Sequence, residues 1–167
     1  MQVIYTFADT PAGNVLLTSD GTFLTGLHWK VFKRAPRAMS DWREDASFFR
    51  DTLRQLDEYF AGNRQTFDIP HQAQGTEFQK SVWRELATIP YGAISSYQKV
   101  ADAISRPKAV RAVGTAIGSN PLSIFVPCHR VLTSNGQLGG YAGGLPSKAL
   151  LLQREGIQMP SMAPYLS

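Results

Sequence analysis

The first thirty residues alternate apolar and polar side chains in three short runs, at positions 2–7, 14–18 and 23–29. Alternation with a period of two places every second side chain on the same face, which predicts half-buried β-strands. Turn-forming residues separate the runs, with Pro11-Ala12-Gly13 after the first and Asp20-Gly21 after the second. Because these connections are short, we expect neighbouring strands to run antiparallel, as a meander.

Helical periodicity replaces this alternation between Trp42 and Ala61. Apolar residues recur there at intervals of three and four positions, namely Phe48, Phe49, Leu53, Leu56, Tyr59 and Phe60. The pattern stops before Gly62-Asn63 and predicts one helix that covers the sheet. A short extended run, Thr66–Ile69, is expected to add a strand. The polar stretch His71–Gly75 then marks the end of an α+β domain of residues 1–73.

Residues 74–167 are expected to form a second, mainly helical domain. Its first helix is predicted to begin at Thr76, because Thr76-x-x-Gln79 has the form of a capping box, and to end before Pro90. Ser95-x-x-Gln98 repeats the capping pattern and opens a short second helix. Pro107 suits the first turn of a third helix that runs to about Ile117. The expected fold class is therefore α+β, a small antiparallel sheet with a helix followed by a helical domain.

Two short helices on either side of the turn Ser105-Arg106-Pro107 predict a winged-helix-like helix-turn-helix. At 100° per residue, the second helix gathers an apolar stripe of Val110, Val113, Gly114 and Ile117. Its other side carries Lys108, Arg111, Ala112 and Thr115, with Ala109 and Ala116 beside them. Cations among such small side chains let a helix approach a phosphate backbone, and Arg111 is long enough to enter a groove. An alanine-rich face exposed to solvent is the alternative explanation.

Charge is distributed unevenly along the chain, whose formal net charge is +4. Residues 1–90 carry ten Lys and Arg against eleven Asp and Glu, whereas residues 91–167 carry seven against two. A basic C-terminal part favours contact with a polyanion, although a solvated basic face without a partner is the commoner cause of such an excess. The sequence has neither the pattern of a secretory leader nor an apolar stretch of membrane-spanning length. We therefore expect a cytoplasmic protein without membrane contact.

Cys128 is the only cysteine of the chain, so it forms neither an internal disulfide nor a thiolate metal cage. The apolar run Ile124–Val126 is predicted to be a strand that delivers it to a cleft. A free thiol with a pKa of about 8.5 is mostly protonated at neutral pH, so a nucleophilic role requires a nearby base or cation. His129 and Arg130 could supply one, with His129 acting through a water or after a bend in the strand. A buried, unreactive cysteine is the simpler alternative.

The segment Ile124–Val131 closely resembles the active-site signature of the O6-alkylguanine-DNA alkyltransferases, also called methylated-DNA-protein-cysteine methyltransferases. Five further segments are similar to family segments and follow the family order: Thr76–Trp83, Ile89–Tyr97, Arg111–Pro121, Gly139–Gly144 and Lys148–Gly156. Six ordered matches make coincidence negligible. The N-terminal part resembles the family's ribonuclease-H-like domain in its strand pattern and in the turn Thr10–Asn14.

The resemblance implies a role for each matching residue. Cys128 would accept the alkyl group, while His129 and Glu155, acting through a water, would withdraw the thiol proton. Asn120 would order the active-site turn, and Tyr97 would donate a hydrogen bond to the departing guanine. The walls of the base pocket would come from Val131, Gly139, Tyr141, Ala142 and Ser123, the last two standing where some relatives carry serine and proline.

The resemblance also implies the partner, which is double-stranded DNA bearing O6-alkylguanine. Family members bind it through the minor groove, rotate the damaged nucleotide out of the helix and transfer its alkyl group irreversibly, so each molecule acts once. O4 of thymine is an expected second target. Arg111 would take the space of the extruded nucleotide, with further DNA contacts from Arg106, Lys108, Ala112 and Thr115. We expect a monomer without cofactor or metal, because relatives with a zinc site use N-terminal cysteines that this chain lacks.

Two alternatives remain open on the sequence alone. A non-catalytic DNA-binding protein would use the helix-turn-helix and be indifferent to replacement of Cys128. A cysteine hydrolase would use Cys128 and His129 and continue to release product after one equivalent.

Overall fold

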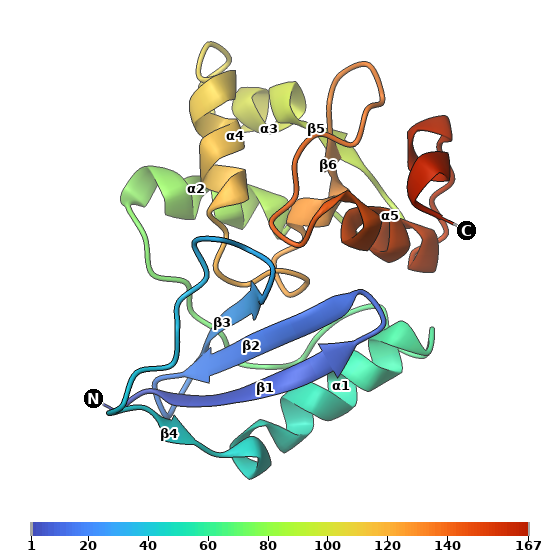
Figure 1. Cartoon of the computed structure of the whole chain (residues 1–167). Helices are drawn as coiled ribbons and strands as arrows, with labels where there is room; N and C mark the ends of the chain where they lie inside the picture. The colour runs from blue at the N-terminus through green and yellow to red at the C-terminus, as the bar shows by residue number, and fades with distance from the viewer. Residues whose placement is uncertain (1, 167) are drawn as a thin grey trace.

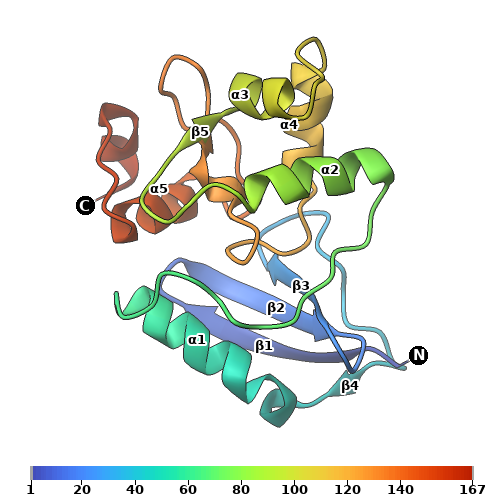
Figure 2. The same cartoon turned by 180° about the vertical axis from the view of Figure 1, so that it is seen from behind.

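The computed structural model describes residues 2–166 of the chain. Figure 1 shows a sheet with one long helix in the lower part of the molecule and a group of shorter helices above it. In Figure 2, seen from behind, a single extended segment leads from the lower part to the first of the upper helices. The small antiparallel sheet followed by a helical part confirms the predicted fold class.

The lower part contains a four-stranded sheet in the order β3-β2-β1-β4. Its strands are β1 (Ile4–Thr10), β2 (Gly13–Ser19), β3 (Leu24–Trp29) and β4 (Arg43–Glu44). The first three pair antiparallel, which confirms the meander, and β4 adds a short parallel edge beside β1. The first hairpin is tight because Thr10 pairs directly with Gly13, whose φ of 139° is open only to glycine without strain.

One helix, α1 (Arg50–Phe60), covers a face of this sheet (Figure 1). The sequence places the start of this helix too early, at Trp42. The Asp45 side chain accepts a hydrogen bond from the Phe48 amide, so helical backbone begins only with the 3-10 turn η1 (Ala46–Phe49). A capping carboxylate thus decides the boundary.

The strand expected at Thr66–Ile69 does not form. The side-chain amide of Gln55 on α1 takes both backbone groups of Asp68: Oε1 accepts from its N–H at 2.8 Å, and Nε2 donates to its carbonyl at 3.3 Å. These bonds occupy groups that a neighbouring strand would need. The chain pairs with β3 only afterwards, through a single bridge between Leu24 and His71.

As far as residue 166, the upper part contains four α-helices, two short strands and two 3-10 turns. The helices are α2 (Glu77–Leu86), α3 (Tyr97–Ala103), α4 (Val110–Gly118) and α5 (Leu145–Arg154). The strands β5 (Ser95–Ser96) and β6 (Val131–Leu132) pair in parallel, and the 3-10 turns are η2 (Cys128–Arg130) and η3 (Pro160–Tyr165). α3 and α4 pack against each other as the expected helix-turn-helix. No helix within residues 2–166 combines the length and apolar character needed to cross a membrane.

The capping box at the start of α2 is confirmed. Thr76 Oγ1 accepts from the Gln79 amide at 3.1 Å, and Gln79 Oε1 accepts from the Thr76 amide at 2.9 Å. Two orphan amide groups of the helix terminus are therefore satisfied by neighbouring side chains.

The sequence places the starts of α3 and α4 too early. Ser96, the second residue of β5, caps α3 by accepting from the Lys99 amide, so the helix begins at Tyr97. α4 begins at Val110, since residues 107–109 form a turn closed by a hydrogen bond from the Ala109 amide to the Arg106 carbonyl.

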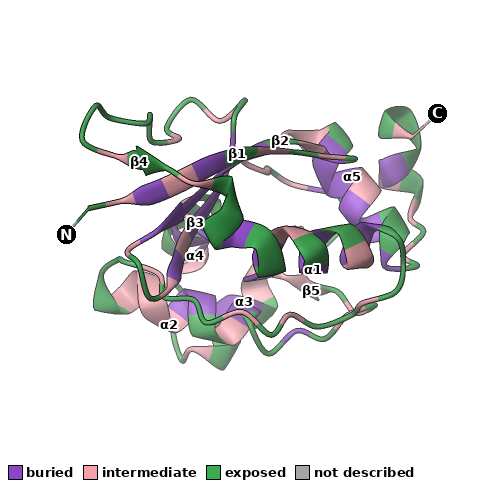
Figure 3. Ribbon diagram, turned by 90° about the horizontal axis from the view of Figure 1, so that it is seen from below, coloured by how far each residue is buried: buried purple, intermediate pink, exposed green. Residues whose placement is uncertain are grey.

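The two parts of the molecule share one hydrophobic core. Figure 3 shows buried residues along the strands and along the inward sides of α2 and α5. Trp29 at the end of β3 is 1% exposed and packs on Gly143, where any side chain would come within 2.7 Å of the indole ring. Ser147 on α5 also donates a hydrogen bond to the Ala12 carbonyl in the β1–β2 turn. The sheet and the helical part are therefore interlocked rather than merely adjacent.

Thr76→Ala is expected to lower the free energy of unfolding by about 1 kcal/mol, because the first turn of α2 loses the acceptor for the Gln79 amide. Chemical denaturation of the purified variant measures this loss. Thr22→Ala is the control, since Thr22 is exposed and its hydroxyl makes no hydrogen bond within residues 2–166. It should change stability by less than about 0.5 kcal/mol. Equal losses in the two variants would contradict the capping role.

Candidate active site

The apolar run before Cys128 folds into a tight turn, so the predicted strand at Ile124–Val126 is wrong. Asn120 holds this turn from inside: its Nδ2 donates to the Val126 carbonyl at 2.9 Å, and its Oδ1 accepts from the Leu122 amide at 3.0 Å. Ile124 lies at the tip with a φ of 74°, which β-branched residues rarely adopt. Its side chain is 2% exposed, so core packing and the Asn120 amide together hold the strained residue in place.

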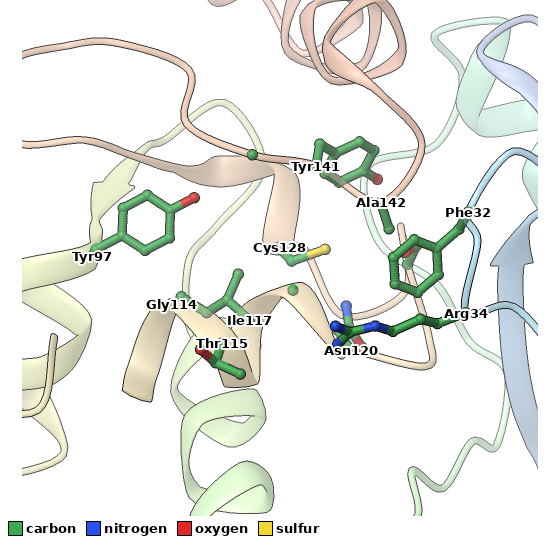
Figure 4. Close-up of a pocket in the computed structure, with 13 residues that line it drawn as sticks. Phe32, Arg34, Tyr97, Gly114, Thr115, Ile117, Asn120, Cys128, Tyr141 and Ala142 are labelled. Carbon is green, nitrogen blue, oxygen red and sulfur yellow. The ribbon is translucent and has the colours of Figure 1, made fainter. Parts of the chain in front are cut away.

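Cys128 begins η2 and is 4% exposed, at the edge of a cavity of about 550 Å³. Figure 4 shows its sulfur turned into this cavity, with Tyr97 on one side and Tyr141 and Ala142 on the other. The volume falls in the range of about 300–1,000 Å³ that is usual for small-molecule pockets. A ring-sized ligand can therefore lie against the thiol.

Three of the five residues predicted for the pocket line the cavity, namely Ser123, Tyr141 and Ala142. Gly139 and Val131 are not among its lining residues. Gly139 instead makes room for Tyr97, whose hydroxyl oxygen would be 2.7 Å from any β-carbon added there. The Val131 carbonyl is held by a hydrogen bond from the Lys148 side chain.

Phe32 and Arg34, which the sequence analysis did not single out, also line the cavity. Both belong to the loop between β3 and β4, so the sheet part of the molecule supplies one wall of the pocket (Figure 4). The segment 30–37 carries four cations and no acidic residue. The net charge summed over residues 1–90 conceals this cluster of cations, because acidic residues elsewhere in that range cancel it. The net charge of a shorter segment reveals it.

Burial raises the pKa of the Cys128 thiol, and hydrogen bonds from Asn120 and Ser123 and the charge of Lys148 offset only part of this effect. The thiol is therefore protonated at neutral pH. Nucleophilic attack by its sulfur requires that the proton pass to a base close by.

His129 follows Cys128 on η2 and shares a buried hydrogen-bonded cluster with Glu155. His129 Nε2 lies 2.7 Å from Glu155 Oε2, and Arg130 donates to both carboxylate oxygens, from Nε at 2.7 Å and from Nη2 at 3.0 Å. Tyr59 donates to the same Oε2 at 2.6 Å. The 3-10 turn brings His129 and Arg130 to one side, which an extended strand would not do.

The carboxylate fixes the protonation of the histidine ring. Burial alone would raise the pKa of Glu155, but hydrogen bonds from His129, Arg130 and Tyr59 lower it to about 2. The ionised carboxylate can only accept, so Nε2 carries the proton and Nδ1 has the free lone pair. Nδ1 is buried and has no partner within residues 2–166. Burial also lowers the pKa of His129, which leaves a neutral imidazole able to take up a proton.

Lys148 is a third residue of the site that the sequence patterns did not indicate. It is fully buried on α5, and its ammonium group donates to the carbonyls of Val131, Leu138 and Gly140. Burial lowers the pKa of Lys148 to about 8, while the nearby Cys128 thiolate would raise it. The available signal was its position one turn before Leu151 and Leu152, on the apolar side of the helix. Lys148 ties β6 to the loop that forms a wall of the cavity.

The predicted polyanion-binding face divides between a helix and a turn. Arg111, Ala112 and Thr115 are exposed on α4, and Thr115 also lines the cavity. Arg106 and Lys108 are exposed in the preceding turn and not on the helix. Ala116, which the sequence places beside this face, is 3% exposed, and its carbonyl accepts from the Trp83 indole. Arg111 forms no ion pair within the described part of the chain.

Two family profiles match the chain. The profile of the 6-O-methylguanine DNA methyltransferase DNA binding domain matches residues 77–157. The profile of the ribonuclease-like domain of 6-O-methylguanine DNA methyltransferase matches residues 3–73. Together the two matches include the sheet, all the α-helices and the residues of the cluster around Glu155.

Similar proteins span nearly the same length. A methylated-DNA-protein-cysteine methyltransferase of Methanosarcina acetivorans is 45% identical over 152 residues, which cover 91% of this chain and 97% of the relative. One from Mycobacterium tuberculosis is 42% identical over 157 residues, 94% of each chain. The crystal structure of Mycobacterium tuberculosis OGT in complex with DNA superimposes with a TM-score of 0.86 at 40% identity, covering 97% of this chain and 98% of that one.

The stability contributed by Glu155 is expected to depend on pH. Because folding lowers its pKa from 4.5 to about 2, the ionised cluster contributes about 3 kcal/mol above pH 4.5 and loses this as pH falls towards 2. The gap in unfolding free energy between the wild type and Glu155→Gln should therefore narrow between about pH 6 and about pH 3, as measured by urea denaturation. Glu44→Gln, at an exposed position on β4, is the control. A constant gap for Glu155→Gln would refute the lowered pKa.

Proposed function

The chain belongs to the 6-O-methylguanine DNA methyltransferase family, and we propose that Cys128 is the residue that accepts the alkyl group. The protein is a methylated-DNA-protein-cysteine methyltransferase, which repairs DNA by moving an alkyl group to one of its own cysteines. This activity excludes both alternatives that the sequence left open, the non-catalytic DNA-binding protein and the cysteine hydrolase. The observation that carries the assignment is that the single cysteine opens into the cavity and is followed in the chain by His129, which is bonded to Glu155.

The thiol proton passes to Nδ1 of His129, through a water between the two groups. The unpartnered Nδ1 and the raised pKa of Cys128 support this path. Glu155 stabilises the imidazolium that forms, because its charge is opposite and already bonded to Nε2. The thiolate then attacks the alkyl carbon: the new S–C bond forms as the bond from that carbon to O6 of guanine breaks, and the bonding electrons go to the guanine.

Tyr97 assists the departure of the guanine. Burial raises the pKa of Tyr97, so the phenol is protonated at neutral pH and can donate a hydrogen bond to the ring. Its hydroxyl lies over Gly139 at one side of the cavity, opposite Tyr141 and Ala142. A guanine that receives a proton or hydrogen bond as charge develops is a better leaving group. Asn120 contributes indirectly, by holding the turn that aims the sulfur.

The base reaches the cavity by rotating out of the duplex. O6 of guanine lies within a stacked and paired helix, and extrusion costs a few kcal/mol, least for a poorly paired damaged base. α4 borders the cavity and exposes Ala112 and Thr115, whose small size suits close approach in the minor groove. Arg111 fills the space that the nucleotide leaves, while Arg106 and Lys108 contact phosphates from the preceding turn.

The product is a thioether on Cys128, which offers no ready leaving group, so each molecule reacts once. O4-alkylthymine is a second proposed substrate, since it presents an alkylated oxygen beside a ring nitrogen in the same way.

A monomer carries every group that this scheme uses, and we propose that it acts in this form in the cytoplasm. The proposed domains, 1–73 and 74–167, then have different roles. The second binds DNA and carries the reacting cysteine, and the first helps to hold the His129–Glu155 pair that takes up the thiol proton.

One equivalent of protein is expected to repair at most one equivalent of O6-methylguanine in duplex DNA. Intact-protein mass measurement should show a gain of one methyl group, and peptide mapping should place it on Cys128. Cys128→Ser is expected to lose the transfer and to keep its affinity for DNA, because the substitution leaves α4 unchanged. Sustained release of product beyond one equivalent would contradict the proposed function.

Arg111→Ala is expected to slow repair of duplex DNA far more than transfer from a free O6-alkylguanine base, because only the duplex substrate requires extrusion of a nucleotide. Single-turnover rates at saturating protein measure both reactions. Lys108→Ala is the matched control: a lost phosphate contact weakens binding, and its duplex rate should recover at saturation. Equal slowing of Arg111→Ala on both substrates would instead indicate damage to the Cys128 pocket.

A further inference from the structure

The geometry assigns to Tyr59 a positioning role in alkyl transfer: helix α1 of the sheet part sets the orientation and proton affinity of the His129–Glu155 pair through one buried hydrogen bond. This inference rests on the proposed function, in which that pair takes up the thiol proton. Tyr59 lies 96 residues before Glu155 in the chain and belongs to the part of the molecule that carries no reacting group.

Three donors meet on one carboxylate oxygen. Glu155 Oε2 accepts from Tyr59 Oη at 2.6 Å, from His129 Nε2 at 2.7 Å and from Arg130 Nη2 at 3.0 Å. The oxygen that orients the histidine is therefore the same one that the tyrosine holds. Oε1 accepts only from Arg130 among the residues described, so the tyrosine bond is not spread over the whole carboxylate.

The tyrosine ring has little freedom to leave this position. Tyr59 is 1% exposed, and its ring packs edge-on against Phe60 at 5.1 Å and Tyr91 at 6.2 Å and beside Phe67 at 5.4 Å, measured between centroids. Arg154 closes the junction by donating to the Phe60 carbonyl at the end of α1. The C-terminal ends of α1 and α5 thus meet beside the carboxylate, which forms its ion pair with Arg130.

The hydrogen bond also affects proton affinity. Burial and the charge of Glu155 raise the pKa of Tyr59 far above its ordinary value, so the phenol stays neutral and always donates. A donor on Oε2 draws electron density from the atom that polarises the His129 N–H, and so limits the basicity of Nδ1. The other ionisable groups around the pair are Arg130 and Cys128 on η2, Lys148 on α5, Tyr91 and Tyr141. Of these groups, Arg130 alone donates a hydrogen bond to Oε2.

Tyr59→Phe removes this bond and keeps the ring. With less competition on Oε2, Glu155 attracts the imidazolium proton more strongly, Nδ1 becomes more basic, and His129 stays protonated to a higher pH. The midpoint of the acid limb of the pH–rate profile should rise by about half a pH unit, and the single-turnover rate at pH values below that midpoint should fall about threefold. The assay uses saturating full-length protein and a duplex containing O6-methylguanine.

Tyr91→Phe is the matched control. Tyr91 donates at the same junction, but to the Arg154 carbonyl at 2.9 Å, and it touches the Tyr59 ring without bonding to Glu155. The expected result is an unchanged midpoint for Tyr91→Phe and a raised midpoint for Tyr59→Phe, whatever the change in thermal stability of each. A midpoint for Tyr59→Phe equal to that of the wild type would overturn the inference, because a purely structural tyrosine would alter stability alone.

Incorporation of 3-fluorotyrosine at position 59 tests the same idea without removing a contact. The fluorinated phenol is the stronger donor, so the midpoint should move to lower pH, opposite to the shift in Tyr59→Phe. No shift, or a shift in the same direction, would also overturn the inference. Failure of the proposed function is separately visible, since the wild type itself would then not gain one methyl group on Cys128.

Discussion

The buried carboxylate of Glu155 is the constraint on which the arrangement of this molecule depends. An ionised carboxylate buried there without partners would cost several kcal/mol, a large share of the net stability of a domain, so it must be surrounded by donors. The chain provides them from two separate places: η2 gives His129 and Arg130, and α1 gives Tyr59. The end of α5, the 3-10 turn and the end of the sheet-covering helix are therefore fixed relative to one another by a single group.

The cysteine that precedes His129 in the chain is also buried. Burial keeps the thiol protonated and unreactive towards solvent, and in the proposed mechanism reaction depends on His129, which the carboxylate holds. Asn120 and Lys148 complete the arrangement from the other side, by fixing the turn before Cys128 and the loop after it. Reactivity at this site is thus a property of the packed fold and not of the Cys128–His129 dipeptide.

Sequence patterns predicted those parts of the fold that local interactions decide. The meander follows from alternation and turn residues, and the start of α2 follows from Thr76 and Gln79, which bond to each other within one helical turn. The family resemblance named Cys128, His129 and Glu155, and the structure brings the last two together. Local patterns failed where a distant side chain intervened, as when Gln55 takes the backbone of Asp68, or Asn120 turns an apolar run that otherwise favours a strand.

Tyr59, Lys148, Phe32 and Arg34 were missed for a related reason. Local sequence pattern alone accounts for each of them. Tyr59 belongs to the apolar stripe of a helix, Lys148 is a lysine within another helix, and Phe32 and Arg34 lie in a basic loop. Their importance comes from partners far away in the chain, and periodicity carries no information about such pairs. The contact between Trp29 and Gly143 also joins residues that are far apart in the chain. It has a consequence for the evolution of this fold. The freedom of residue 143 to vary is set by the residue at position 29, so recombination that exchanged one half of the molecule for that of a distant relative would have to exchange both partners or neither.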